Sequence, residues 1–412
     1  MLKPAGAHCN LRCKYCYYLE KAALYAQPSL SEQLLEEFTR QYIEAQTMPQ
    51  VLFTWHGGEP LLLPIPFYKK ALELQRRYAG GRQIDNCLQT NGLLLNDEWC
   101  EFLAENRFLV GISVDGPECL HNRYRHDAAG HPTADRVMAA IRLLQKHGVE
   151  WNAMAVVTGD TARNPREFYQ FFRDIGCEYL QFTPVVERIC NRSDGLRLAS
   201  GNMTGGELTA ESVSPDDWGR FLCAVYDEWV RADVGRLFVQ LFDATLANWV
   251  GEPPGICAMS PSCGHAAVME CNGDVYSCDH FVFPDFLLGN IRQQTLTAML
   301  YGHQQQAFAL AKTAALPRQC RECRFLRLCW GECPRNRFAT DGYGEPGLNY
   351  LCPGYHHFFE HVAADMEFMA HELAEGRAPA NIMVWHNTHN NEIFQNDRGA
   401  DEDTLTGTRT AE

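Results

Sequence analysis

The grouping of cysteines constrains the fold of this 412-residue chain more than any other feature of its sequence. Three of the 18 cysteines lie near the N-terminus as Cys9, Cys13 and Cys16, and nine fall between Cys257 and Cys352. No apolar run approaches the roughly 20 residues that span a bilayer, and the first residues lack the apolar core of a secretory signal. We therefore expect a cytoplasmic protein, and in that reducing compartment grouped cysteines more often bind metal than form disulfides.

Length and charge narrow the class of protein further. A chain of this length with 46% hydrophobic residues can bury a large core and is expected to form two or three domains. Its 36 Lys and Arg residues face 51 Asp and Glu residues, which gives a formal net charge of -15. This balance argues against nucleic acid or an anionic membrane as the main partner and suits a basic peptide.

Short β-rich runs alternate with amphipathic stretches up to about residue 190, a pattern typical of repeated βα units around a parallel sheet. Six strands with intervening helices predict an α/β fold, a partial (β/α)6 barrel whose chemistry lies at the carboxyl ends of the strands. The expected strands are residues 2–4 (a short first strand), 51–55, 84–90, 109–115, 149–157 and 178–185.

Helix signals and composition give the expected boundaries. Ser29 and Glu32 predict a capping box, and Thr133 can cap a second helix that Gly148 is placed to end in a left-handed turn. Residues 194–214 are rich in Gly, Ser and Thr, which predicts a loop or linker before a helix around 218–230. We expect the barrel at 1–235, a Cys-rich domain at 236–375 and a polar, mobile tail at 376–412.

The N-terminal cysteines have the spacing C-x3-C-x2-C. A structural zinc site normally closes with four ligands, whereas three thiolates on a 4Fe-4S cluster leave one iron free to bind another molecule. A zinc knuckle that borrows a distant fourth cysteine is the alternative. Downstream, the segment HGGEP at 56–60 offers paired glycines, which permit close backbone approach, and Glu59, which can accept a hydrogen bond from an ammonium group.

With aromatic residues on both sides of Cys16, this pattern resembles the radical S-adenosylmethionine (SAM) superfamily, in which SAM binds the open iron and is cleaved to a 5'-deoxyadenosyl radical. Taken singly, Ser113 is as typical of a strand-end hydroxyl, Arg125 of a solvated surface charge and Val186 of a core residue. The resemblance implies that SAM is bound by Tyr15, Gly58, Glu59, Ser113, Arg125 and Val186.

The downstream cysteines resemble the SPASM extension of radical SAM proteins, which implies two auxiliary 4Fe-4S clusters and three clusters in all. Spacing alone does not fix the grouping, and C-x2-C pairs also suit tetrahedral zinc. Iron is favoured because substrate oxidation needs an electron acceptor and zinc does not change its oxidation state. The implied ligands are Cys257, Cys263, Cys278 and Cys333 for one cluster and Cys320, Cys323, Cys329 and Cys352 for the other.

Asp279 directly follows Cys278, a position that would hold its carboxylate near a redox centre. There it could accept a proton from a substrate thiol or hydroxyl while the neighbouring carbon is oxidised. The alternative is an ordinary turn or cap residue.

Over about residues 1–375 the chain closely resembles the anaerobic sulfatase-maturating enzymes, in the segments LKPAGAHCNLRCKYCYYLEK, VLFTWHGGEPL, NCLQTNG, LVGISVDGP and NGDVYSCDHFVFP. The resemblance implies an oxidoreductase that converts a Cys or Ser in the C/S-x-P-x-R motif of a sulfatase to Cα-formylglycine, with Asp279 as the base and SAM cleaved to 5'-deoxyadenosine and methionine. The implied partners are an unfolded or nascent sulfatase polypeptide and a small electron donor such as flavodoxin or ferredoxin.

Two other functions remain as alternatives, and the sequence differs from the family pattern in two places. A related SPASM enzyme could instead cross-link a Cys sulfur to carbon in a small peptide, and a zinc-stabilised binding protein with a decayed barrel would need neither cofactor. The expected first strand is short for the family, because only eight residues precede Cys9. The tail beyond about residue 383 has no counterpart in the family.

Overall fold

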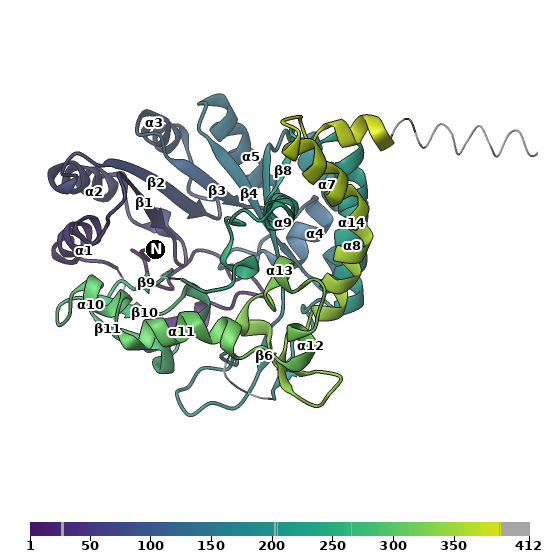
Figure 1. Cartoon of the computed structure of the whole chain (residues 1–412). Coiled ribbons are helices and arrows are strands. Elements are labelled where there is room, and N and C mark those ends of the chain that lie inside the picture. The colour runs from purple at the N-terminus through teal and green to yellow at the C-terminus, as the bar shows by residue number, and fades with distance from the viewer. Residues whose placement is uncertain (26–28, 202, 204, 265, 387, 389–412) are drawn as a thin grey trace, which may run out of the picture.

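A computed structural model describes residues 1–25, 29–201, 203, 205–264, 266–386 and 388. Its centre is a six-stranded parallel sheet in the order β1-β2-β3-β4-β5-β8, which curves around an open side (Figure 1). The helices that connect the strands lie along its outer side, so that chemistry is left to the inner side and the strand ends. The strands are β1 (Gln50–Trp55), β2 (Gln83–Thr90), β3 (Leu109–Ser113), β4 (Trp151–Val157), β5 (Tyr179–Pro184) and β8 (Phe238–Val239).

The outer helices form because their apolar residues recur at helical spacing and bury one face against the sheet. In α1 the buried residues include Leu34, Leu35 and Phe38, and in α5 they include Val137 and Ile141. The helices of this region are α1 (Glu32–Glu44), α2 (Ile65–Tyr78), α3 (Asp97–Glu105), α4 (Glu118–Tyr124), α5 (Ala134–Lys146), α6 (Gly159–Ala162) and α7 (Pro165–Asp174).

The helix caps differ from the sequence-based expectation. Ser31, rather than Ser29, is the N-cap of α1 and accepts a hydrogen bond from the backbone N–H of Leu34, so the predicted capping box was wrong. Thr133 does occupy the N-cap position of α5, but its hydroxyl donates to the Arg125 carbonyl at 2.9 Å instead of capping the helix. Gly148 has φ +64° just after that helix, as its position predicted.

The expected first strand at residues 2–4 is not a strand of the barrel. Leu2 instead makes single parallel bridges to Trp55 on β1 and to Met269 on β9 (Val268–Met269), and so joins the edge of the barrel to the Cys-rich region. The sixth strand of the sheet is β8, which lies just beyond the expected domain boundary at 235. The N-terminal segment is therefore a link between the two regions.

The Cys-rich region contains short strands and helices that lie along the open side of the barrel (Figure 1). Its three-stranded antiparallel sheet has the order β11-β10-β9. The elements are β10 (Asp274–Tyr276), β11 (Leu287–Asn290), α10 (Leu296–Leu300), α11 (His303–Ala314), α12 (Arg318–Arg321), α13 (Leu326–Cys329), β12 (Ala339–Thr340) and β13 (Pro346–Leu348).

Three long helices connect the two regions: α8 (Pro215–Ala232), α9 (Gln240–Val250) and α14 (Cys352–Ala374). Helices α8 and α14 touch through glycines, since a Cβ built on Gly219 would lie 2.9 Å from the Gly354 Cα. Small residues at this crossing allow the two backbones to approach closely. The Cys-rich region is thereby packed onto the barrel along a whole helix.

Two segments pack more closely than their composition suggests. The described residues of 194–214 are largely irregular, as the expected loop predicts, but they include β7 (Glu207–Leu208), which pairs with β6 (Arg188–Ile189), and they bury Leu196 and Val213. Ile382 is buried in the core although it falls within the expected tail at 376–412, most of which lies outside the described residues. In the described part of the chain, none of the helices has the length and apolarity that a membrane crossing requires.

Candidate active site

The Cys9–Cys16 loop is held in place by the HGGEP segment that follows β1. The backbone N–H of Gly58 donates to the Gly6 carbonyl at 2.7 Å, and that of Glu59 donates to the His8 carbonyl at 2.8 Å. A Cβ on Gly58 would lie 2.1 Å from the His8 carbonyl oxygen, so no side chain fits at this position. The glycine pair therefore permits close backbone contact, which fixes where the cysteine loop begins.

The structure brings Cys9, Cys13 and Cys16 close enough together for their thiols to interact electrostatically. Burial raises the pKa of Cys9 to about 11 and that of Cys13 to about 12, so both thiols keep their protons when no metal is bound. Metal binding replaces such protons and couples cluster loading to the order of this loop. Asn91 donates to Asn10 at 2.7 Å and to the Cys9 sulfur at 3.6 Å and steadies the loop from the end of β2.

Arg125 lies beside this cysteine loop and is buried, so the alternative of a solvated surface charge was wrong. Its guanidinium forms two hydrogen bonds with Asp115, Nε to Oδ2 at 2.8 Å and Nη2 to Oδ1 at 3.1 Å. The Tyr15 hydroxyl donates to the same carboxylate. Burial favours the neutral acid, but Arg125 outweighs it and holds the pKa of Asp115 below its usual range. Tyr15 and Arg125, predicted separately, thus belong to one hydrogen-bonded unit.

The other residues expected to bind SAM lie at strand ends around the same loop. Ser113 ends β3 and accepts a hydrogen bond from Gln89 at 2.9 Å, and Val186 is buried just after β5. Glu59 is fully buried and already accepts hydrogen bonds from Leu61 N–H at 3.0 Å and Asn91 N–H at 2.8 Å. Burial raises the pKa of Glu59 to about 7. These hydrogen bonds connect the turn that follows β1 to the end of β2.

The nine downstream cysteines include two separate sets of four. Electrostatic interactions connect the members within each set. All members of the second set line one cavity of about 360 Å³, which also reaches Phe325 and Tyr355. The first set is Cys257, Cys263, Cys278 and Cys333, and the second is Cys320, Cys323, Cys329 and Cys352.

The second set of cysteines lines a cavity, which bears on the kind of metal centre it would hold. Tetrahedral zinc draws its thiolates to within about 2.3 Å of a single point. A 4Fe-4S cluster instead binds its thiolates at the corners of a cube, and the hollow between the second set of cysteines fits such a group.

Asp279 begins a short 3-10 helix (Asp279–Phe281) directly after Cys278, where its side chain is 15% exposed. Lys3, which is fully buried, forms an ion pair with it, and the Tyr17 hydroxyl donates to Oδ2 at 2.5 Å. Burial opposes ionisation of Asp279, but Lys3 outweighs it and holds the pKa of this carboxyl well below its usual range. Asp279 is therefore an ionised group at the junction of both regions and is more than a turn residue.

Sequence reasoning did not single out several residues of this site. Lys3 and Tyr17 bind Asp279 directly, while His56 and His280 lie near it with pKa values that burial lowers to about 4. All four lie inside the segments that carried the family resemblance. Tyr17, His56 and His280 had a sequence signal, because each is a polar residue beside a cluster ligand, a glycine pair or Asp279, whereas Lys3 had none.

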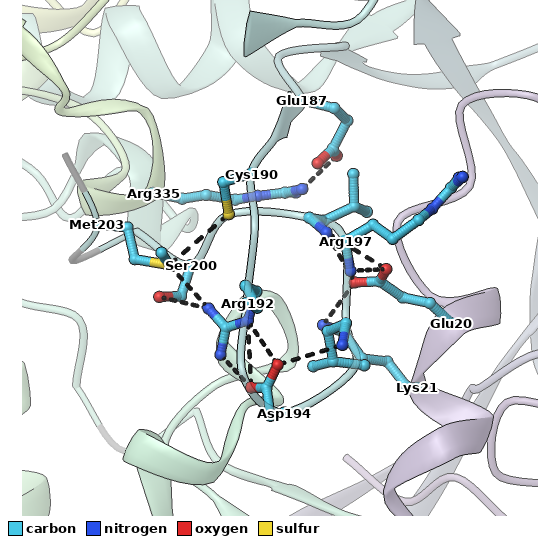
Figure 2. A network of polar contacts seen from close by, with 12 residues as sticks. Glu20, Lys21, Glu187, Cys190, Arg192, Asp194, Arg197, Ser200, Met203 and Arg335 are labelled. Carbon is cyan, nitrogen blue, oxygen red and sulfur yellow. Dashed lines mark hydrogen bonds and ion pairs between the residues drawn. The ribbon is translucent and has the colours of Figure 1, made fainter. Parts of the chain in front are cut away.

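A network of charged residues links the segment after β5 to this site (Figure 2). Glu187 is buried and forms an ion pair with Arg335, whose guanidinium lies 4.8 Å from the centre of the Tyr17 ring. At the other end of the segment, Glu20 accepts a hydrogen bond from the Arg197 N–H at 2.8 Å. The segment is thereby held to both the barrel and the Cys-rich region.

Comparison with known proteins agrees with this geometry. Residues 4–172 match the radical SAM superfamily, and residues 262–324 match an iron-sulfur cluster-binding domain. The chain is 59% identical to a serine-type anaerobic sulfatase-maturating enzyme of Bacteroides thetaiotaomicron, over 93% of this chain and 94% of that protein. It is 32% identical to a cysteine-type enzyme of Clostridium perfringens, over 88% of this chain and 95% of that one.

The fold is also similar to a solved structure. Native anSMEcpe with bound AdoMet and the Kp18Cys peptide superimposes with a TM-score of 0.80 at 31% identity, over 90% of this chain and 98% of that one. Such identity over nearly the whole length, together with both matched domains, extends beyond a shared fold. The chain belongs to the anaerobic sulfatase-maturating enzymes of the radical SAM superfamily.

Proposed function

We propose that this enzyme oxidises a Cys or Ser in the C/S-x-P-x-R motif of an unfolded or nascent sulfatase to Cα-formylglycine, with Asp279 as the catalytic base. The observation that supports this most strongly is the ionised, mostly buried carboxylate of Asp279, held by Lys3 and Tyr17 beside the cluster ligand Cys278. It lies where the barrel and the Cys-rich region meet. A substrate carbon between the two regions could reach both a radical source and an electron acceptor.

The cysteine sets determine where each cofactor would bind. Cys9, Cys13 and Cys16 would hold the cluster that binds SAM, with Tyr15, Gly58, Glu59, Ser113, Arg125 and Val186 around it. When bound, SAM supplies a radical that removes a hydrogen atom from the substrate Cβ, and the auxiliary clusters supply an electron acceptor. The two sets of four cysteines would hold these auxiliary clusters at the sites described above.

The proton of the substrate then passes to the protein. As the carbon radical loses one electron, its S–H or O–H group loses one proton, and a C=S or C=O double bond forms. Asp279 is the acceptor of that proton. A weak base suffices, because a thiol or hydroxyl on a carbon that is being oxidised is far more acidic than an ordinary one. Water then converts a thioaldehyde to the aldehyde and hydrogen sulfide.

Lys3 and Tyr17 keep Asp279 in the required state. The Lys3 ammonium disfavours protonation of the carboxylate before substrate arrives, and the Tyr17 hydroxyl fixes the orientation of Oδ2. Lys3 itself is positioned by its backbone, since its N–H donates to the Met269 carbonyl of β9 at 2.9 Å. The same N-terminal link that joins the two regions thus orients the base.

The partners follow from the chemistry. The acidic balance of the chain suits a peptide that carries the motif arginine. The higher identity to a serine-type relative than to a cysteine-type one supports a serine peptide as a substrate, and a flavodoxin or ferredoxin would supply electrons.

The test compares Asp279→Asn with Asp233→Asn in the reconstituted holoenzyme, using Cys and Ser peptides of the motif. Asp233 is a matched control, because it also accepts a hydrogen bond from a tyrosine, Tyr169, and pairs with a basic residue, Arg173, and it belongs to neither the Cys9–Cys16 loop nor the two cysteine sets. Asp279→Asn should retain its iron and lose about 100-fold or more of formylglycine formation, whereas Asp233→Asn should retain activity. Full activity of Asp279→Asn would exclude this base, and a thioether product would favour the peptide cross-linking alternative.

A further inference from the structure

Two cationic side chains lie close to the cysteines of the downstream sets. Lys312 on α11 is 1% exposed and interacts electrostatically with Cys263 and Cys333 of the first set. Arg337 is partly buried just after a 3-10 helix (Pro334–Asn336), and it interacts with Cys263 and Cys333 of the first set and with Cys320 of the second. Each cation is therefore close to cluster ligands, and Arg337 is close to ligands of both clusters.

Neither cation is paired with a carboxylate within the described residues. The Lys312 ammonium donates to the Ala258 carbonyl at 2.8 Å and to the carbonyl of Cys257. Glu332 is the acidic residue that interacts with both cations, but its carboxylate accepts its hydrogen bonds from Asn336 and Asn349. Burial of a charge without an ion partner destabilises a fold, so another negative group should compensate for it.

The backbone around Arg337 is shaped to hold its guanidinium. Trp330, Gly331 and Glu332 have φ values of 49°, 69° and 52°, and their three carbonyl oxygens all accept hydrogen bonds from Arg337. A Cβ on Gly331 would lie 2.8 Å from the Arg337 Nη2 atom. Left-handed conformations at residues other than glycine are unfavourable, so this turn persists because surrounding contacts stabilise it.

This turn has a special place in the sequence. It connects Cys329, which belongs to the second set, with Cys333, which belongs to the first. The guanidinium is thus fixed at the short stretch of chain that joins the two auxiliary clusters. A cation held here by backbone carbonyls, with Glu332 near it but not paired to it, has charge left to interact with both clusters.

We propose that Lys312 and Arg337 are the counter-charges of the two auxiliary clusters and raise their reduction potentials. A 4Fe-4S cluster with four thiolates is a net anion and gains a further negative charge when it accepts an electron. A fixed cation nearby favours this reduced form, and it does so strongly where little water screens the charges. The clusters themselves would supply the negative charge that compensates these two cations.

The consequence for catalysis rests on the proposed function. The substrate carbon radical gives one electron to an auxiliary cluster and its thiol or hydroxyl proton to Asp279, so that the carbon is oxidised and the cluster is reduced. A higher cluster potential makes this electron transfer more favourable. Lys312 and Arg337 would act on the acceptor without touching substrate.

The experiment measures the midpoint potentials of the auxiliary clusters by EPR-monitored redox titration of full-length holoenzyme without substrate. The same titration in a Cys9→Ala, Cys13→Ala, Cys16→Ala background removes the overlapping signal of the N-terminal cluster. The variants are Lys312→Gln and Arg337→Gln, which lose the charge, and Arg337→Lys, which keeps it. Arg292→Gln is the matched control, because the exposed Arg292 guanidinium also donates to a backbone carbonyl, that of Asn272 at 3.0 Å.

We expect both charge-removing variants to shift at least one auxiliary potential to more negative values at unchanged iron content, while Arg337→Lys and Arg292→Gln stay near the wild type. If Arg337→Gln fails to retain iron, the potentials of Lys312→Gln and Arg337→Lys show whether the cations act through their charge or only by holding the fold. Potentials unchanged in iron-replete Lys312→Gln, or shifted as much in Arg337→Lys as in Lys312→Gln, would overturn the proposal. Because no peptide is present, this outcome is independent of whether the enzyme makes formylglycine.

Discussion

The barrel and the Cys-rich region are organised by different forces. The barrel has parallel strands with buried apolar side chains such as Phe53, Val110 and Leu180, and outer helices that bury one face. The Cys-rich region has strands of two to four residues and many turns, and it carries two sets of four cysteines, the second of which lines a cavity that fits a metal cluster. The comparison indicates that one half of the site depends on packing and the other half on metal.

Removal of one cluster ligand should have the largest effect on the difference in stability between the barrel and the Cys-rich region. Structural metal sites contribute on the order of 10 kcal/mol to folding, so Cys333→Ala should unfold the Cys-rich region while the barrel stays protected. Iron should fall from about twelve per chain to about eight if only this cluster is lost, and to about four if the unfolded region also releases the cluster of the second set. Hydrogen exchange of residues 257–350 against residues 50–157 measures the difference.

The matched control is Cys223→Ala, which removes a buried thiol of α8 that belongs to neither set. It should keep its iron and lose only about 1–2 kcal/mol of stability. Equal protection of both regions in Cys333→Ala would show that the Cys-rich region folds without its metal.

Disruption of a backbone contact in the barrel should have an intermediate effect, which is a loss of SAM cleavage. Gly58→Ala would place a methyl group 2.1 Å from the His8 carbonyl oxygen, and the loop must move to accommodate it. Such overpacking costs about 1–3 kcal/mol, which at about 1.4 kcal/mol per tenfold predicts a loss of SAM cleavage between about 5-fold and about 150-fold. The assay measures 5'-deoxyadenosine released by the reduced holoenzyme.

Gly342→Ala is the control for that substitution, because the atom nearest to its added methyl group would be Gln319 Oε1 at 3.7 Å. It should cleave SAM at the wild-type rate. If Gly58→Ala did the same, the contact between the glycine pair and the cysteine loop would not determine how the loop is placed.

Acidification should produce the smallest effect, and in the barrel it should act through His121. Burial lowers the pKa of His121 to about 4 from an ordinary 6.5, so the unfolded chain binds more protons between these values. This contribution is present at neutral pH and is lost as the pH falls. It amounts to about 1 kcal/mol between pH 7.5 and 5.5, measured as a fall in the barrel's free energy of unfolding.

His121→Asn should weaken this pH dependence, whereas substitution of the exposed His131 by Asn should leave it unchanged. An identical slope in wild type and His121→Asn would assign the acid sensitivity to other groups. The result would separate proton-linked stability in the barrel from metal-linked stability in the Cys-rich region.

The sequence predicted those features that depend on local pattern. Five barrel strands were predicted to within a few residues, since their apolar runs are long, and the cysteine sets follow from a family resemblance. β8 was missed because two residues carry no periodicity, and Ser29 was preferred to Ser31 because both precede the same apolar stripe.

Contacts between residues that are far apart in the sequence could not be predicted, because they leave no local pattern. The pairing of Arg125 with Asp115 depends on where α4 ends relative to β3. The ion pair of Lys3 with Asp279 joins the N-terminal segment to the Cys-rich region. Neither has a signature within a sequence window. The active site is thus predictable as a set of residues, whereas its connections become visible only in three dimensions.

The helix α14 has a consequence for biosynthesis. Its first residue, Cys352, is a member of the second cysteine set, and Gly354, two residues onward, presses against Gly219 of α8. A nascent chain leaving the ribosome therefore cannot complete the outer wall of its barrel until nearly the whole protein has been synthesised. Docking of α14 onto α8 is therefore a late step in synthesis, and the same stretch of chain supplies Cys352 to the second cysteine set.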